Sequence, residues 1–531
     1  MASRDVASPQ GLRPCVPILF FILVVCSSLT LCGWDHAIVL CGLFCIHCHR
    51  RQIYATSVVL LFTLSFPPFS WPTWWFCFGP MIWLWRDESV RLSKSRITTE
   101  SVVIGFAMGW LSTGFVRAGL PEWGWLIHSV ACLVFSLQFL AVAVAIRLMR
   151  KQPAVKAAVV TAAVAVGGEL VAAWLGVSWS VSNFSLTVGA TPLAQWSRWI
   201  TPFGVAGILY LVNFLLSPHS SSDRKQRWLG PAMGVGLLCV AWCGGGLIAA
   251  NTSVAPLPFS AMLVQPHRKI AHKEPWRPWL HLDHLTRASL LKHPKVDLIV
   301  WPEACLSESW SHFHESDNND IATQLTVQDF AKLLTPAFKT NCLVGAVMNE
   351  RGTTQRHGLE VAAVRRYNCG CLVSKSGEIG HHEKLDLVPL KEGVPALFDN
   401  DWMRNHIFPR LHLNPTLAYG REYAPLSFRD LRGNQHWIAV SVCYESLLPW
   451  LPQYRESSTV DAIIHIIYDG NSAEHPGMMQ RHIRACQFRA IETRKWNLVC
   501  STWAGTSLID PTGRIVRQLP PVAGVLRTDT L

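Results

Sequence analysis

Apolar residues are distributed unevenly along this chain. From about Val16 to Ala250 they form runs separated by short polar or basic segments, whereas after Asn251 charged residues, His and Pro become frequent and no long apolar run recurs. A helix needs roughly 20 apolar residues to cross a bilayer, so the first part has the pattern of a multi-span membrane region. We therefore predict a transmembrane helical domain at residues 1–250 and a second domain at residues 251–531.

Five runs in the first domain predict membrane spans: Ser101–Val116, Gly124–Ile146, Ala157–Leu175, Ile200–Leu216 and Trp228–Ala250. Four earlier runs are shorter or broken by Pro, so some are expected to be re-entrant or tilted, and the number of spans stays open. They are Pro17–Cys32, Ala37–Cys48, Tyr54–Phe69 and Pro72–Trp85. The first of these could also be the apolar core of a signal peptide, but it lacks a clear small-residue cleavage site, and we favour an uncleaved span.

Basic residues gather in the breaks between pairs of apolar runs. The positive-inside rule places such clusters in the cytoplasm, so the last span crosses outward alone and everything after Asn251 is expected outside the cytoplasm. The chain has a net charge of +12, but many of its basic residues lie in these short loops. They do not form one basic face with interleaved aromatic residues, so we expect no nucleic-acid partner. The clusters are His49–Arg51, Arg86–Arg96, Arg147–Lys156 and Arg224–Arg227.

Glu169 is an ionisable residue inside an otherwise apolar predicted span. Such a side chain costs about 2.5–3.5 kcal/mol on insertion scales unless it faces protein or water. We expect it either to contact a lipid headgroup or to pair with a neighbouring helix, and the sequence favours neither.

The second domain alternates short apolar runs with segments of helical length. This alternation favours an α/β domain with central sheets and flanking helices. The predicted strands are Ala261–Val264, Val296–Trp301, Leu343–Val347, Trp437–Val442, Ala462–Ile467 and Ser507–Ile509, and the predicted helices include Asn319–Leu334 and Gln480–Arg494.

Three chemically capable residues lie beside these apolar runs. Glu303 follows one predicted strand directly after Pro302, Cys443 ends another, and Lys384 precedes an apolar stretch that ends in turn residues. Each alone is more often a solvated carboxylate, a buried filler thiol or a surface charge. Seven of the 17 cysteines follow Asn251, an odd number, so at least one of these is unpaired within a single chain.

The flanking signatures of these three residues resemble those of the nitrilase superfamily. They are Trp301-Pro302-Glu303, Lys384 with Leu387-Val388-Pro389 and Glu392-Gly393-Val394-Pro395, and Cys443-Tyr444-Glu445. Within that superfamily, nearly the whole chain resembles the apolipoprotein N-acyltransferases, membrane enzymes that complete bacterial lipoprotein acylation. Further matches are Thr191–Gln195, Phe203–Gly207, Asn213, Val264-Gln265, His482 and Arg489–Glu492. The resemblance implies a multi-span helical domain followed by an α-β-β-α sandwich.

The resemblance also implies a Glu303, Lys384 and Cys443 triad. Glu303 would take the thiol proton, and Lys384 with the backbone N–H of Tyr444 would stabilise the oxyanion that forms when Cys443 attacks an ester. A phospholipid would supply the acyl chain through a thioester, and the amine of a diacylglyceryl apolipoprotein would accept it. No cofactor or metal is implied. The implied location is the bacterial inner membrane with the catalytic domain on the periplasmic side, and we expect a monomer.

Further residues receive weaker roles. Glu392 and Glu445 match acidic positions of the family and could position Lys384 or the incoming amine, while Asn368 is a weaker match. Arg489 and Glu492 are one helical turn apart and are interpreted as a structural ion pair. Exposed apolar side chains are expected to dip into the membrane interface, among them Leu448, Trp450 and Leu451.

The sequence departs from the family pattern at several places. Gly470–Ser472 replaces the usual small residue, Trp and Phe, Lys391 stands where Gly is typical and His382 where Tyr is typical. No apolar run follows Leu526, so only the first domain is expected to anchor the chain. Two rival functions therefore stay open: a membrane-tethered amidase, in which water resolves the acyl-enzyme, and a catalytically silent lipid- or lipoprotein-binding homologue.

Overall fold

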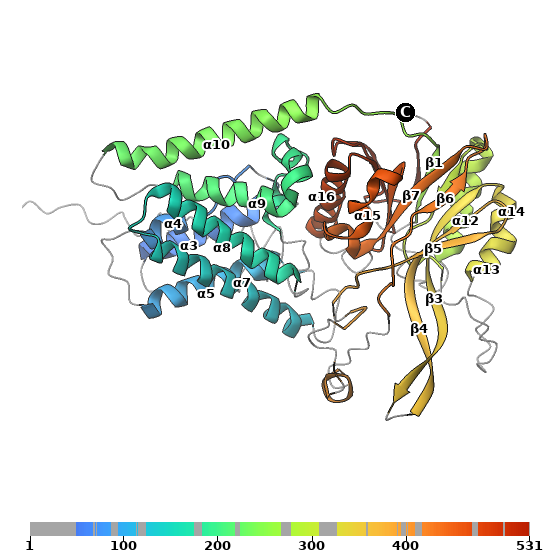
Figure 1. Cartoon of the computed structure of the whole chain (residues 1–531), viewed down its shortest axis with the longest axis horizontal. Helices are drawn as coiled ribbons and strands as arrows, with labels where there is room; N and C mark the ends of the chain where they lie inside the picture. The colour runs from blue at the N-terminus through green and yellow to red at the C-terminus, as the bar shows by residue number, and fades with distance from the viewer. Residues whose placement is uncertain are drawn as a thin grey trace, which may run out of the picture.

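The computed structural model shows two halves side by side along the long axis (Figure 1). A bundle of helices forms one half, two β-sheets with flanking helices form the other, and the long helix α10 leads from the first to the second. The described residues are 49–66, 70, 72–86, 94–112, 114, 124–174, 183–217, 224–266, 278–306, 326–356, 359–389, 391–394, 400, 402–408, 417–469, 476–502 and 505–529.

Among the described residues, the bundle contains four helices that are long and apolar enough to cross a membrane. They are Gly124–Leu148, Ala154–Trp174, Pro192–Leu216 and Trp228–Ala250, so four of the five predicted spans are confirmed in length and composition. The described helices of this half are α3 (His49–Ser65), α4 (Gly79–Arg86), α5 (Lys94–Ser112), α7 (Gly124–Leu148), α8 (Ala154–Trp174), α9 (Ser197–Leu216) and α10 (Arg224–Ala250), with the short helices η1 (Phe184–Thr187) and η2 (Pro192–Trp196) between α8 and α9.

The predicted span Ser101–Val116 is the exception. It falls in α5, which begins seven residues earlier and ends at Ser112, and the apolar part Ile97–Leu111 is shorter than a bilayer requires. The run Pro72–Trp85 forms a turn followed by the short α4 and not a continuous helix. The runs Pro17–Cys32 and Ala37–Cys48 lie outside the described residues.

Glu169 pairs with the protein. Its carboxylate accepts hydrogen bonds from Tyr210 Oη of α9 at 2.6 Å, from Asn183 Nδ2 at 2.8 Å and from the Phe184 backbone amide at 3.3 Å. Buried polar groups are tolerated when they are hydrogen-bonded. Of the two expectations for Glu169, pairing with neighbouring elements is therefore the one that the structure supports.

The second half is the predicted sandwich of two sheets between helical layers. Within the part of the chain that the structure describes, each sheet has six strands and mixes parallel with antiparallel pairs. The first has the order β12-β1-β2-β3-β4-β5 and the second the order β11-β10-β9-β8-β7-β6. The strands are β1 (Ala261–Gln265), β2 (Leu298–Val300), β3 (Asn341–Arg356), β4 (Leu359–Val373), β5 (Ile379–Glu383), β6 (Leu426–Arg429), β7 (Gln435–Val442), β8 (Ala462–Ile467), β9 (Trp496–Ser501), β10 (Ser507–Ile509), β11 (Ile515–Gln518) and β12 (Gly524–Arg527).

Alternating side chains divide each sheet between two apolar cores. In β1, Leu263 faces the core between the sheets, whereas Met262 and Val264 face the helical side with Leu282 of α12 (Pro278–Lys292). On the other outer face, Val499 of β9 packs with side chains of α16 (Pro476–Thr493). Because strand side chains alternate with a period of two, every strand that is buried on both faces contributes to two cores.

The apolar runs predicted where several strands and helices lie, but not all of their bounds. The run Val296–Trp301 shortens to β2, and Leu343–Val347 is only the beginning of β3, which pairs with β4 in a long projecting hairpin (Figure 1). The predicted helix Asn319–Leu334 is described from Val327, and helical structure continues to Phe338. The predicted helix Gln480–Arg494 is confirmed as α16, four residues longer at its start.

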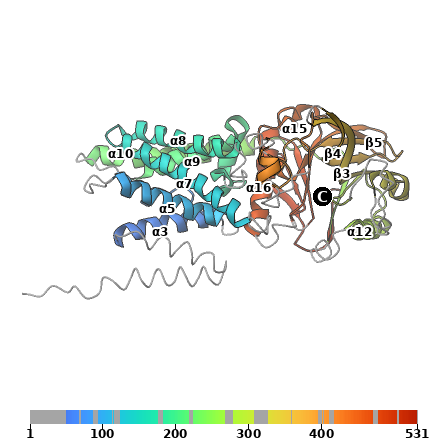
Figure 2. The same ribbon diagram turned by 90° about the horizontal axis from the view of Figure 1, so that it is seen from below.

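Helix α16 lies between the helix bundle and the second sheet in both views (Figures 1 and 2). Arg484 on this helix donates to the carbonyl oxygens of Leu186 at 2.6 Å and Thr187 at 3.0 Å, and to Ser70 Oγ at 2.7 Å. Arg494 donates to Gln195 Oε1 at 2.8 Å. The membrane half therefore holds the sandwich through α16.

The expectation that Leu448 and Leu451 dip into the membrane interface is wrong. Both are buried, with 1% and 7% of their surface exposed, in an apolar cluster that also contains Phe184 and Leu186 of the helical half. Trp450 is partly exposed and stacks on Phe203 of α9, with ring centroids 6.2 Å apart. This loop contacts the membrane domain because tertiary docking covers apolar side chains that would otherwise face solvent.

Candidate active site

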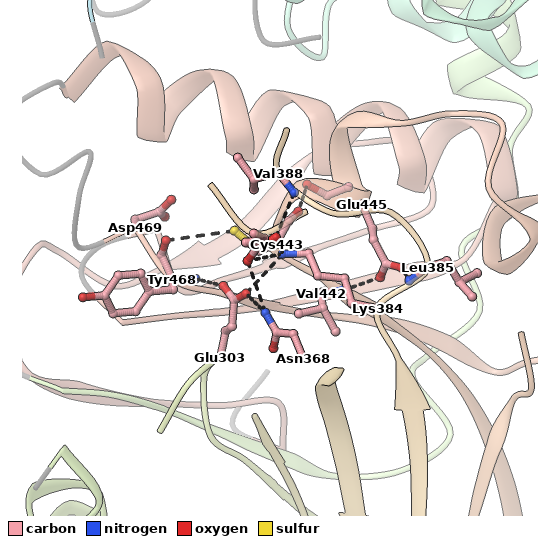
Figure 3. Close-up of polar contacts among 12 residues, drawn as sticks. Glu303, Asn368, Lys384, Leu385, Val388, Val442, Cys443, Glu445, Tyr468 and Asp469 are labelled. Atoms are coloured by element: carbon pink, nitrogen blue, oxygen red, sulfur yellow. Dashed lines mark hydrogen bonds and ion pairs between the residues drawn. The ribbon is translucent and has the colours of Figure 1, made fainter. Parts of the chain in front are cut away.

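Glu303, Lys384 and Cys443 come together at the carboxyl ends of strands (Figure 3). Glu303 follows β2, Cys443 follows β7, and Lys384 directly follows β5. Parallel strands bring the residues after them to one edge, which is where α/β proteins gather their chemistry. The structure thus brings the three candidate catalytic residues into one cluster.

The Glu303 carboxylate is held by three donors. Its Oε1 accepts from Asn368 Nδ2 at 2.7 Å and from Lys384 Nζ at 3.3 Å, while Oε2 accepts from the Tyr468 backbone amide at 2.7 Å. Only 3% of Glu303 is exposed. A carboxylate fixed this firmly has one orientation from which to take a proton.

A close backbone approach supports the Glu303 turn. Gly345 of β3 donates its amide to Pro302 O at 3.2 Å, and a Cβ atom on Gly345 would lie 2.4 Å from Glu303 Cα. Only glycine fits at this position without a backbone shift.

Lys384 lies between two carboxylates. Its Nζ is 2.8 Å from Glu392 Oε2 and 3.3 Å from Glu303 Oε1, and its side chain is fully buried. Burial alone would lower the pKa of Lys384, but Glu392 and then Glu303 outweigh burial and raise the pKa above its ordinary value. Burial likewise opposes ionisation of Glu392, and Lys384 reverses this and lowers the pKa of that carboxyl. Lys384 is therefore a fixed cation.

Cys443 lies at the first position of the short helix η7 (Cys443–Leu447) with a left-handed backbone, φ +51°. Non-glycine residues adopt this conformation rarely, and when they do it is often at functional sites. Burial raises the pKa of the thiol well above its ordinary value, Glu303 adds to this effect, and Lys384 opposes it. The resting thiol is thus protonated and needs a base to become a nucleophile.

Glu445 joins three segments of the site without contacting Lys384 Nζ. Its carboxylate accepts from the Val442 amide at 2.7 Å, the Leu385 amide at 2.7 Å and His382 Nε2 at 3.2 Å, and it is fully buried. It positions Lys384 indirectly, by fixing the backbone that follows it. His382 is thereby part of this support.

Other predicted residues also have clear places. Tyr444 is buried with 4% exposed in the cluster that η7 shares with the helical half. Arg489 Nη2 and Glu492 Oε2 form the predicted ion pair at 2.7 Å. Gly470–Ser472 lies outside the described residues.

The sequence undervalued two groups. Asn368, a weak match by sequence, donates to Glu303 and also to Glu392 Oε1 at 3.3 Å, so that it bridges both carboxylates. The sequence marks His482 only as a match to the family pattern, yet its Nε2 lies 3.0 Å from the carbonyl oxygen of Cys443. In the sequence, the signals for these two residues are the dipeptide Tyr367-Asn368 and the position of His482 on a predicted helix.

The cysteines in the described part of the chain are all free thiols. Cys369 and Cys371 are fully buried in the first sheet, where burial raises the pKa of both. They behave as small apolar fillers, whereas Cys443 is only partly buried. Among the same described residues, no group of three or more His, Cys, Asp or Glu side chains could hold a metal ion.

Comparison with known proteins finds matches in both halves. Residues 263–529 match the family model described as carbon-nitrogen hydrolase, and residues 59–215 match the one described as apolipoprotein N-acyltransferase N-terminal domain. Apolipoprotein N-acyltransferase of Pseudomonas aeruginosa is 27% identical over 490 residues, which cover 87% of this chain and 81% of that protein. Apolipoprotein N-acyltransferase 2 of Treponema denticola is 27% identical over 237 residues, 44% of this chain and 41% of that protein.

Among solved structures, Nit3 of Saccharomyces cerevisiae, a member of branch 10 of the nitrilase superfamily, matches 52% of this chain and 92% of its own. Its sequence identity is 14% and the TM-score is 0.33. The two family models cover the helical half and the sandwich in the order in which the structure has them.

Proposed function

The chain belongs to the carbon-nitrogen hydrolase family, and on that premise we propose that it is an N-acyltransferase of lipoprotein maturation. It moves a fatty acyl chain from a phospholipid, through a thioester on Cys443, to the N-terminal amine of a diacylglyceryl apolipoprotein. The observation that carries the proposal is Lys384, fully buried between the Glu303 and Glu392 carboxylates beside the Cys443 turn.

Acylation is the first half-reaction. Glu303 takes the Cys443 proton, and the thiolate attacks the ester carbonyl of the phospholipid. Lys384 Nζ and the Tyr444 backbone N–H stabilise the oxyanion of the tetrahedral intermediate. The intermediate collapses, the glycerol oxygen leaves as the alcohol of a lysophospholipid with the proton from Glu303, and the acyl chain stays on sulfur.

Transfer to the amine is the second half-reaction. The free amine of the lipid-modified Cys attacks the thioester, and Glu303 accepts the proton that the amine releases. The tetrahedral intermediate expels the Cys443 thiolate, which regains this proton, and the product is an amide. Glu392 keeps Lys384 in place in both halves, and neither half-reaction calls for a cofactor.

The membrane location supports these substrates. Both the donor and the acceptor carry acyl chains that partition into a bilayer. Residues of η7 share one apolar cluster with the helical half, so the turn that carries Cys443 is close to the membrane-spanning helices. We place the catalytic domain on the periplasmic face of a bacterial inner membrane, because the basic segments between the spans are expected on the opposite side.

A direct test is acyl transfer in membranes that contain the protein. A fluorescent phospholipid and a diacylated lipopeptide are supplied, and mass spectrometry follows an acyl adduct on Cys443 and the amide product. Cys443→Ala is expected to abolish both signals. Release of fatty acid alone would instead indicate the amidase-type reaction with water, and absence of turnover a binding protein. Retained transfer by Cys443→Ala would overturn the proposal.

A further inference from the structure

The carbonyl oxygen of Cys443 is held by two donors from outside its own peptide unit. His482 Nε2 on α16 lies 3.0 Å from it, and Ser446 Oγ of η7 donates to it at 2.9 Å. The mechanism above uses neither side chain. His482 is buried, with 2% of its surface exposed.

His482 donates a hydrogen bond from Nε2. A carbonyl oxygen can only accept, so the 3.0 Å contact with Cys443 O requires an N–H at this ring nitrogen. The other ring nitrogen, Nδ1, lies 3.3 Å from Asp469 Oδ1. The ring is thus held between the Asp469 carboxyl group and the Cys443 carbonyl.

Asp469 is itself fixed. Its Oδ2 accepts from Ser501 Oγ at 3.1 Å, and its backbone amide donates to Thr502 Oγ1 at 3.2 Å, both from the end of β9. Only 4% of Asp469 is exposed. The ring of His482 therefore has one orientation, set by the second sheet on one side and the nucleophile turn on the other.

The Cys443 carbonyl and the Tyr444 amide belong to the same peptide unit. In a planar trans peptide the C=O and N–H bonds point in opposite directions, so fixing the oxygen fixes the direction of the N–H. Cys443 has φ +51°, a conformation that the chain adopts only where its surroundings require it. Donation from His482 Nε2–H to the carbonyl also polarises the peptide and strengthens the Tyr444 N–H as a donor.

We propose that His482, with Asp469, is a positioning residue that orients and polarises the Cys443–Tyr444 peptide, so that the Tyr444 N–H serves as the oxyanion donor. The inference rests on the proposed acyl chemistry and deepens it, because it assigns the device that builds the oxyanion site. His482 touches neither substrate nor sulfur and acts only through the peptide. Its effect is thus confined to steps that develop negative charge on oxygen.

Two reactions of the same thiol separate this role from a general structural one. Thioester formation with a phospholipid passes through an oxyanion, whereas alkylation of Cys443 by iodoacetamide is a displacement at carbon that forms none. His482→Leu in the full-length protein is expected to slow thioester formation about 100-fold, the loss typical of removing one oxyanion donor. Its alkylation rate is expected to stay within about threefold of wild type, and its KM for phospholipid to stay unchanged, since ground-state binding is untouched.

His482→Gln restores an N–H donor on a differently shaped side chain and is expected to recover part of the lost rate. His284→Leu, on an exposed position of α12, is the matched control and should match wild type in both reactions. An equal fall in acylation and alkylation in His482→Leu would show a merely structural role, and an unchanged acylation rate would show no role; either result overturns the inference. If Cys443→Ala still formed product, the proposed function itself would fail, independently of His482.

Discussion

At the scale of single residues, the site is set by one ammonium group between two carboxylates. A buried Lys would ordinarily shed its proton, but Glu392 and Glu303 keep it charged. The sequence pointed to Glu303, Lys384 and Cys443 because each follows or precedes a short apolar run with its own signature. It left open whether Glu392 positions Lys384 or the incoming amine, since nothing local says which of the two a glutamate eight residues downstream will meet.

Glu392→Gln tests this arrangement. The variant leaves Lys384 with Glu303 as its remaining carboxylate partner, so Nζ is expected to move toward Glu303. We expect kcat for acyl transfer to fall about 100-fold, the loss that a misplacement of about 1 Å can cause. Steady-state kinetics with fluorescent phospholipid and lipopeptide measure this change in kcat. Glu378→Gln, on an exposed turn after β4, is the control, and wild-type kinetics in Glu392→Gln would contradict the assignment.

At the scale of elements, strand ends determine where the chemistry lies. The runs Ala462–Ile467 and Ser507–Ile509 were predicted with the bounds of β8 and β10, because their side chains are mostly apolar. Strands β4, β5 and β9 were not predicted, although β4 carries Asn368 and β5 leads to Lys384. Their sequences mix Cys, His, Asn and Arg, and their membership in a sheet comes from pairing with neighbours rather than from an apolar run.

The crossing of β3 and the Glu303 turn gives an element-scale prediction. In Gly345→Ala the new Cβ would lie 2.4 Å from Glu303 Cα and 2.5 Å from Pro302 O, and backbone atoms cannot rotate away. We expect a loss of about 1–3 kcal/mol in stability, as for overpacked cores, together with reduced acyl transfer. Thermal unfolding in detergent and the transfer assay measure both effects. Gly380→Ala in β5, whose Cβ would meet Leu426 Cδ2 at 3.5 Å, should change little.

Strand β8 gives a prediction about pH. Burial lowers the pKa of His465 to about 3, against an opposing hydrogen bond with Asn497. In the unfolded chain the pKa is about 6.5, so between these values the unfolded state binds the extra proton. The free energy of unfolding should therefore fall by about 1.4 kcal/mol for each pH unit below about 6.5 through this group alone.

His465→Gln should remove that contribution. The expected result is a smaller loss of melting temperature between pH 7 and pH 5 than wild type shows, measured by thermal unfolding in detergent. The exposed His284 on α12, changed to Gln, serves as the comparison and should keep the wild-type slope. Identical pH slopes in His465→Gln and wild type would show that His465 is not held neutral.

At the scale of the whole molecule, α16 connects the two halves. It carries Arg484 toward the carbonyl oxygens of η1 and His482 toward the nucleophile turn, while its apolar side chains pack on the second sheet. A patterned helix was predicted here, but its partners on both sides were not. One helix therefore sets the place of the turn that carries Cys443 relative to the membrane-spanning helices.

Arg484→Gln should loosen this connection. The shorter side chain leaves the carbonyl oxygens of the buried Leu186 and Thr187 without this donor, at a cost of about 1–3 kcal/mol. We expect faster amide hydrogen exchange in η1 and in the first turns of α16, with the sheets unchanged. Arg455→Gln, an exposed position at the end of α15 (Pro452–Arg455), should leave exchange as in wild type. Unchanged exchange in η1 would refute the docking role.

The orientation in the membrane is a prediction of the same scale. The basic breaks between spans are expected in the cytoplasm, so a reporter enzyme that is active only outside the cytoplasm should be active when fused after Pro256. A fusion after Lys151, in the break between α7 and α8, should be inactive. The reverse pattern would place the catalytic sandwich in the cytoplasm and remove its access to periplasmic lipoproteins.

The sequence by itself determined the features that local patterning encodes. A helix that crosses a bilayer requires a long apolar run, and a buried strand requires a short one, so the helical half and the sandwich could both be predicted. The signatures at the strand ends pointed to Glu303, Lys384 and Cys443. Only the tertiary structure decided the partners of buried polar groups. Asn368 between two carboxylates, His482 on the Cys443 carbonyl and the burial of Leu448 all depend on elements far apart in the chain. A residue's neighbours in sequence do not specify which distant donor or acceptor satisfies it once water is excluded.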